Sequence, residues 1–191
     1  MHTEHPDAAE LAALREAFAS GSAPADGTAL GWAGVRAFEA RHGVVLPEPY
    51  RTFVAEIADG SAGGPPSCGL VPLAELPRDW GDGRPERVLG RPFPLIEAWL
   101  WEGDEGTPAE ELDAAIEPVF NDGSIVLGTD GCGMYWHLVV TGRHRGHIWL
   151  VTGEGATPFG DAFGWTTAAP GFAGWVAHWA AGKDWFDAAE G

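Results

Sequence analysis

Three short segments rich in β-branched and aromatic residues follow one another in the C-terminal part of the chain, and they limit the possible folds more than any other feature. They are SIVLGTDG (124–131), MYWHLVVT (134–141) and HIWLVTG (147–153). Glycine-containing turns separate them, a pattern typical of strands joined by hairpins. Connections this short favour antiparallel neighbours, because parallel strands need a long crossover. The sequence therefore predicts an antiparallel meander.

Apolar residues at helical spacing predict helices before and after these strands. Leu11, Leu14 and Phe18 form one apolar stripe, and Asp7 is placed to cap that helix. Gly43 is expected to end the next helix. The further helical stretches are 32–43, 50–57 and 172–179, and Gly182 is expected to stop the last of them. Helices, then strands, then a helix predict a single α+β domain, with an antiparallel sheet of about four to six strands and helices packed against it.

In the stretch from 76 to 118 the apolar residues follow neither helical nor strand spacing, and Gly and Pro are frequent. We expect a short strand leading into it at 68–76 and a short helix near Glu110–Ala115. From Pro92 to Gly142 there is no Lys or Arg, whereas ten carboxylates occur there. A segment whose charges are all negative is either a solvated loop or a functional surface. The expected organisation is an N-terminal helical extension over 1–25 and a main domain over 26–191, with an irregular acidic insertion at about 76–118.

The acidic balance of the chain limits its partners. The formal net charge is −17, and Lys183 is the single lysine. A surface of this sign repels nucleic-acid phosphate and anionic lipid but attracts a basic protein. The sequence has two cysteines far apart, no secretory signal and no apolar run long enough to span a bilayer. We therefore expect a cytoplasmic protein with a protein partner, without direct nucleic-acid or membrane binding.

Two tryptophans, Trp99 and Trp101, stand at the start of the most acidic stretch. An apolar ring beside acids has the composition of an interface anchor with a charged rim. The alternative is that the rings pack within the loop. The residues expected to contact a partner are Trp99, Trp101, Glu102, Asp104, Glu105, Glu110 and Glu111.

The hairpin at 131–151 gathers residues that could bind a metal or catalyse a reaction. Cys132, His137 and His147 occur there, but no second cysteine or paired carboxylate completes the four ligands that zinc usually takes. No G-x-S-x-G element is present, and Ser124 has no local partner that marks it as activated. The turn length, which the sequence leaves open, decides whether the two histidines share a sheet face. We expect ordinary strand histidines, with no catalytic residue, metal or cofactor.

The stretch FEARHGVVLPEPYRTFVAEIADG (38–60) resembles the N-terminal signature of the SUKH superfamily, which includes yeast cell-wall-assembly regulators and many bacterial immunity proteins. The later motifs GCGMYWHLV, GHIW and GFAGWVAHW follow the order typical of that family. The resemblance covers roughly residues 32 to 186 and is poor over 76–118. Ser61 stands where the family often has a second glycine. The family-like positions are Glu39, Gly43, Leu46, Pro47, Tyr50, Phe53, Asp59, Gly60, Gly133, Tyr135, Gly146, Ile148, Trp149, Phe172 and Trp175.

The resemblance implies a non-enzymatic α+β binding domain, in bacteria commonly an immunity protein that neutralises a toxin such as a nuclease or deaminase. It carries over no catalytic residues. The charge agrees with this, because an acidic inhibitor would be steered to the basic surface of such a toxin. Two alternatives stay open: a regulatory scaffold that binds a cellular protein, and a hydrolase or metal enzyme that uses Cys132, His137 and His147.

Overall fold

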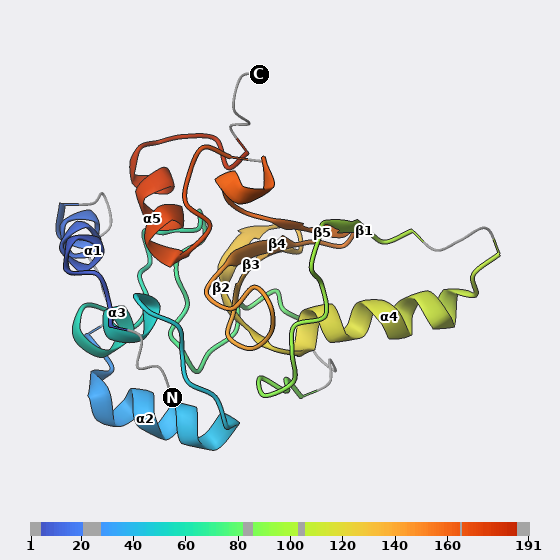
Figure 1. Cartoon of the computed structure of the whole chain (residues 1–191), viewed down its shortest axis with the longest axis horizontal. Coiled ribbons are helices and arrows are strands. Elements are labelled where there is room, and N and C mark those ends of the chain that lie inside the picture. The colour runs from blue at the N-terminus through green and yellow to red at the C-terminus, as the bar shows by residue number, and fades with distance from the viewer. Residues whose placement is uncertain (1–4, 21–27, 82–85, 103–105, 165, 187–191) are drawn as a thin grey trace.

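The computed structural model of the chain describes residues 5–20, 28–81, 86–102, 106–164 and 166–186. Five α-helices, five strands and one 3₁₀ helix make up this described part (Figure 1). In chain order they are α1 (Ala8–Ser20), α2 (Gly31–His42), α3 (Tyr50–Glu56), β1 (Trp99–Leu100), α4 (Ala109–Asn121), β2 (Ser124–Gly131), β3 (Met134–Val139), β4 (Ile148–Val151), β5 (Gly155–Pro158), η1 (Asp161–Phe163) and α5 (Phe172–Ala180).

The five strands form one sheet in the order β1-β5-β4-β3-β2, and every neighbouring pair is antiparallel. The expected α+β class and antiparallel meander are thus confirmed, since β2, β3 and β4 fall within the three segments that predicted them. The sequence pattern does not reveal β1 and β5. They have two and four residues, too few for an alternation of apolar and polar residues to stand out.

Both faces of the sheet are buried. Along β3, Trp136 and Leu138 pack into one core, whereas Tyr135 and Val139 pack into another. The first core holds the inward faces of α1, α2, α3 and α5, and the second holds the C-terminal end of α4 and residues of the segment before β1. Burial on both faces explains why the strand segments are almost continuously apolar in the sequence.

Aromatic contacts join the helices of the first core. The ring centroid of Phe53 in α3 lies 4.8 Å from that of Phe18 in α1 and 5.0 Å from that of Phe172 in α5. The predicted helix signals are confirmed as well. The Asp7 carboxylate accepts a hydrogen bond from the Ala9 N–H (2.7 Å) at the start of α1. The N–H of Gly43, in the left-handed conformation, caps the end of α2.

The loop before the insertion lies along the outer edge of β2. The Val71 N–H donates to the Leu127 carbonyl (2.8 Å), and the Cys68 N–H donates to the Thr129 carbonyl (3.2 Å). The strand expected at 68–76 is reduced to isolated bridges. Pro72 is one reason, because it has no N–H with which to continue the pairing.

Gly128 allows this loop to approach β2. A Cβ atom at this position would lie 2.4 Å from the Gly69 carbonyl oxygen and 2.5 Å from Cδ of Pro66. No side chain fits at such distances, so the close contact between loop and strand requires glycine here.

α4 extends away from the rest of the molecule (Figure 1), and only its last residues, Val119, Phe120 and Asn121, are buried. The short helix expected near Glu110–Ala115 is therefore longer than predicted. A proline inside a helix removes one hydrogen bond, so the sequence pattern favours an end before Pro118. The helix nevertheless continues past Pro118, because Val119 and Phe120 are buried in the second core. The expected boundary between residues 25 and 26 lies outside the described residues and stays a prediction.

Candidate functional site

The family-like signature builds the core and not a surface. Leu46, Tyr50 and Phe53 are buried in the first core. Glu39, buried on α2, accepts hydrogen bonds from the Leu46 N–H (2.9 Å) and from Nε of Arg51 (2.7 Å). Burial alone raises the pKa of this carboxyl group, but these bonds outweigh it and hold the pKa below its ordinary value. The signature residues thus connect α2 to α3, and a functional surface has to be sought elsewhere.

A buried serine–histidine pair joins β2 and β3. Nδ1 of His137 lies 2.9 Å from Oγ of Ser124. Such a pair can activate a nucleophile, and the sequence did not reveal it because the residues meet only through strand pairing. Both side chains have 0% exposure. The hydroxyl group is therefore closed to a substrate, and the pair acts as a satisfied polar contact within the core.

The hairpin turn comprises residues 140–146, because the Val139 N–H donates to the His147 carbonyl (3.0 Å) and the Gly146 N–H donates to the Val139 carbonyl (2.8 Å). His137 is directly opposite Trp149 in the register. Since side chains alternate along a strand, His147 lies on the same sheet face as His137.

The two histidines nevertheless have different neighbours. The ring of His137 lies near those of Trp80 (5.8 Å) and Phe120 (6.4 Å). The ring of His147 lies 5.3 Å from that of His144 and 6.0 Å from that of Phe163. Burial lowers the pKa of His147, and the neighbouring His144 lowers it further.

Within the described residues, no group of three or more His, Cys, Asp or Glu side chains could hold a metal ion. Cys68 and Cys132 are free and exposed. Cys132 lies in the β2–β3 turn with φ of 54°. A thiol nucleophile there would need a base, and the candidate base His137 is enclosed in the second core.

We call residues 99–102 and 109–121 the acidic arm; it consists of β1, the two residues after it and α4. Trp101 is held by two hydrogen bonds: its N–H donates to the Glu154 carbonyl (2.9 Å) and its indole Nε1 to the Thr152 carbonyl (3.0 Å). The rings of Trp99 and Trp101 meet edge to face at 4.8 Å. Both rings are half-buried against the second core, so they pack within the molecule and also keep exposed surface.

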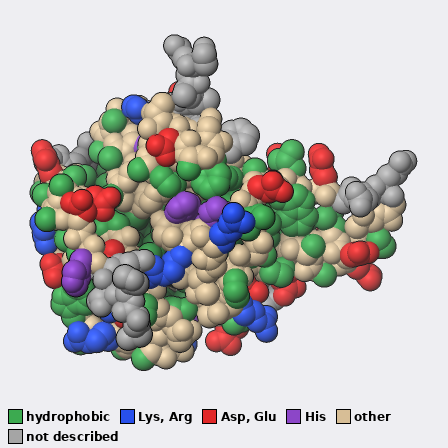
Figure 2. Space-filling view, viewed as in Figure 1, with side chains coloured by type: hydrophobic (Ala, Val, Ile, Leu, Met, Phe, Trp, Pro, Cys, Tyr) green, Lys and Arg blue, Asp and Glu red, His purple; other side chains and the backbone are tan. Residues whose placement is uncertain are grey.

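The acids expected at an interface lie at two ends of the arm. Glu102 follows Trp101, whereas Glu110 and Glu111 are in the first turn of α4; all three are exposed. Trp101 contacts Phe120 at the other end of α4 (6.2 Å), so the two groups are about 15 Å apart along the helix axis. Acidic side chains occur along the projecting arm, and hydrophobic ones gather where it joins the body (Figure 2). Asp104 and Glu105 lie outside the described residues.

The structure adds acidic-arm residues that sequence reasoning missed. A cavity of about 350 Å³ lies between Trp101 and the C-terminal half of α4. Its lining from α4 repeats at helical spacing, which could have been read from the sequence as one helix face. The missed residues are Asp113, Ile116, Glu117, Phe120 and Asn121.

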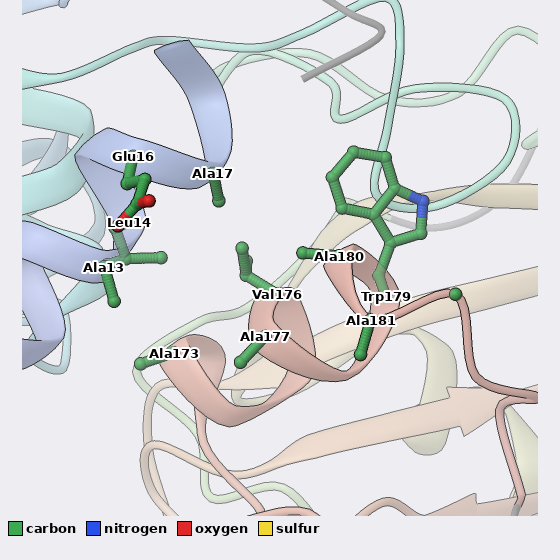
Figure 3. A pocket seen from close by; sticks show the side chains of 11 residues that line it. Ala13, Leu14, Glu16, Ala17, Ala173, Val176, Ala177, Trp179, Ala180 and Ala181 are labelled. Carbon is green, nitrogen blue, oxygen red and sulfur yellow. The ribbon is translucent and has the colours of Figure 1, made fainter. Parts of the chain in front are cut away.

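A second hollow, of about 740 Å³, lies between α1 and α5 (Figure 3). Small apolar side chains from both helices face it, among them Ala13, Ala17 and Ala177. Trp179 is only half-buried and lines this groove. Among the described residues that line the groove, Glu16 is the one ionisable group, so these residues offer no pair of groups for acid–base chemistry.

None of the helices in the described part of the chain is long and apolar enough to cross a bilayer. The fold and the surface together define an α+β domain with one antiparallel sheet between two cores and an acidic projecting arm. The sequence model of the SMI1/KNR4 family (SUKH-1) matches residues 33–178, and the chain belongs to this family. No curated protein and no solved structure matches the chain. The family match confirms the resemblance that the sequence motifs suggested.

Proposed function

We propose that the chain is a non-enzymatic binding domain that acts in the cytoplasm as an immunity protein. It neutralises a basic toxin domain, of nuclease or deaminase type, by covering its surface. Membership of the SUKH-1 family is consistent with such a role. Two free cysteines are consistent with a reducing compartment.

The acidic arm carries this proposal. It offers an exposed carboxylate at Glu102 beside the half-buried rings of Trp99 and Trp101, and two more at Glu110 and Glu111 about 15 Å further along α4. Aromatic anchors surrounded by polar groups are the residues that dominate the energy of protein interfaces. A projecting helix also reaches into a concave partner more readily than a flat surface does.

The charge of the arm is almost uncompensated within the described residues. Its neighbouring ion pair, Arg91 with Asp122, has a long separation of 3.9 Å and an exposed arginine. Ion pairs of this kind contribute little. The field around the arm therefore attracts a basic partner and speeds encounter, an effect that salt weakens.

The test measures association with the partner purified from the source cells or encoded by a neighbouring toxin gene. A triple charge reversal, Glu102→Lys with Glu110→Lys and Glu111→Lys, should lower the association rate by about tenfold or more at low salt. The matched control reverses three exposed acids away from the arm, Glu16, Glu75 and Asp161, and should change the rate much less. Equal rates for the two triple variants would contradict the proposal. A solitary genomic context and a cellular partner would favour a regulatory scaffold instead.

A further inference from the structure

The cavity beside Trp101 combines features that recognise one type of side chain. Its volume of about 350 Å³ is near the lower end of the roughly 300–1,000 Å³ typical of small-molecule sites. The lining changes from exposed to buried: Asp113 and Glu117 are exposed, Ile116 and Trp101 are half-buried, and Phe120 and Asn121 are buried. The opening is thus acidic and the interior is aromatic with one amide.

The two carboxylates lie side by side. Asp113 and Glu117 are four residues apart on α4 and therefore neighbours on one helix face. Like charges at this spacing repel each other, and in the described part of the chain neither carboxylate has an ion-pair partner. A cation placed between them would remove that repulsion.

Asn121 is a buried polar residue of the lining. It is 5% exposed. Its Nδ2 donates to the Glu117 carbonyl (3.0 Å), and this hydrogen bond fixes the orientation of the amide. Oδ1 is buried and receives no hydrogen bond from the described residues. This oxygen has almost no accessible surface, so a ligand in the cavity meets the carboxylates and rings of the lining rather than this acceptor.

The rings select among cations. Trp101 and Phe120 contact each other, with centroids 6.2 Å apart, and both line the cavity. A guanidinium group has five N–H donors, no acceptor and a planar shape that stacks on aromatic faces. An ammonium group carries the same charge but is more strongly hydrated and does not stack. A metal ion is not suited, since no described group of His, Cys, Asp or Glu could hold one.

We infer that this cavity is the subsite that receives an arginine side chain of the partner protein. The guanidinium lies between the carboxylates of Asp113 and Glu117 and against the two rings. The inference rests on the proposed function, because it names the chemistry by which the arm holds its basic partner.

An NMR titration of the whole chain tests the inference with N-acetyl-L-argininamide as the probe. The signals to follow are the indole N–H of Trp101 and the side-chain amide of Asn121. We expect saturable shifts with a dissociation constant in the millimolar range. The neutral isostere N-acetyl-L-citrullinamide should bind at least tenfold more weakly, and N-acetyl-L-lysinamide several-fold more weakly. Equal binding of the citrulline probe, or no saturable shift at these signals, would overturn the inference.

Variants locate the binding. Asp113→Asn with Glu117→Gln should weaken the arginine probe at least tenfold, whereas the control Glu75→Gln with Asp161→Asn should leave it unchanged. The dispersion of the backbone spectrum reports whether each variant is folded. Binding that persists in the first double variant would also overturn the inference. If the probe fails while charge reversal of the arm still slows partner association, only the subsite is wrong; if the probe binds but charge reversal has no effect, the proposed function is wrong instead.

Discussion

The carboxylate of Glu39 and the guanidinium of Arg51 form a two-pronged ion pair, with Nε to Oε1 at 2.7 Å and the second nitrogen–oxygen contact at 3.0 Å. Arg51 also lies over the ring of Trp32, 5.2 Å from its centroid. Parallel bonds of this kind fix geometry as well as adding energy. The pair therefore sets how α2 and α3 pack, and it explains structurally why a glutamate belongs to the family signature.

Glu39→Gln should lower the free energy of unfolding by about 2 kcal/mol at pH 7, because charge-assisted bonds are replaced by neutral ones. The pKa of Glu39 is lowered in the folded state, so its stabilisation is present above the unfolded pKa of the carboxyl group. The stabilisation is lost as pH falls through the folded pKa. Urea unfolding should therefore show a smaller difference in unfolding free energy between wild type and variant at pH 3 than at pH 7.

Glu56→Gln is the matched control for this prediction. Its ion pair with Arg15 is exposed, with side-chain exposures of 41% and 50%, so the loss should stay below about 1 kcal/mol. Equal losses in the two variants, or a Glu39 effect that persists unchanged in acid, would contradict the assignment.

Gly128→Ala should destabilise the fold by about 2–3 kcal/mol, a cost typical of overpacking. The added methyl group would overlap the Gly69 carbonyl oxygen and Pro66, and relief requires the loop to move off β2. Gly153→Ala is the control, because a Cβ there meets no heavy atom within 4 Å. Thermal melts compare the two, and a Gly128 variant as stable as the control would show that the loop moves at no cost.

The sequence predicted the central sheet and the helices well, because their signals are local. Leu11, Leu14 and Phe18 are buried as their spacing predicts, and β2 to β4 were visible as apolar segments between turns. The signature residue Glu39 was recognised by resemblance, but its bond to Arg51 joins residues 12 positions apart. No pattern in the intervening sequence indicates that contact.

The candidate surface was less predictable for the same reason. Trp101 was singled out by composition, yet its partners Thr152 and Phe120 are set by how the β4–β5 turn and α4 meet it. The cavity arises from this meeting and from the spacing of Asp113, Glu117 and Asn121 on α4. Helical spacing alone gives one face of the cavity, and tertiary contacts give the other.

His147 should make the stability of the protein decrease as the pH falls from 7 to 5. Burial and His144 lower its pKa in the folded state, so the unfolded chain takes up the proton first as pH falls below the ordinary histidine value. Stability therefore decreases with falling pH until the folded pKa is passed. His147→Phe removes this contribution and also a buried ring nitrogen that has no hydrogen-bond partner in the described residues.

Thermal melts at pH 7, 6 and 5 should show a smaller decrease for His147→Phe than for wild type. A residual decrease is expected from His42, whose pKa burial also lowers, together with Arg41 and Arg87. His5→Asn is the control, because the His5 side chain is exposed. The same pH dependence in wild type and His147→Phe would rule out this histidine as the source.

Trp101→Phe should separate the contribution of Trp101 to the stability of the fold from its contribution to partner binding. The substitution removes the indole N–H that donates to the Thr152 carbonyl (3.0 Å), and the loss of one such bond costs about 1 kcal/mol. Trp99→Phe is the matched control, because no hydrogen bond of the Trp99 indole occurs among the described residues and its ring packs edge to face on Trp101. Urea unfolding should therefore show a larger loss of unfolding free energy for Trp101→Phe than for Trp99→Phe.

If the arm binds the partner through both rings, each variant should weaken the complex, as interface anchors do. A Trp101 variant that unfolds more easily but binds the partner with unchanged affinity would restrict this residue to holding β1 against the β4–β5 turn.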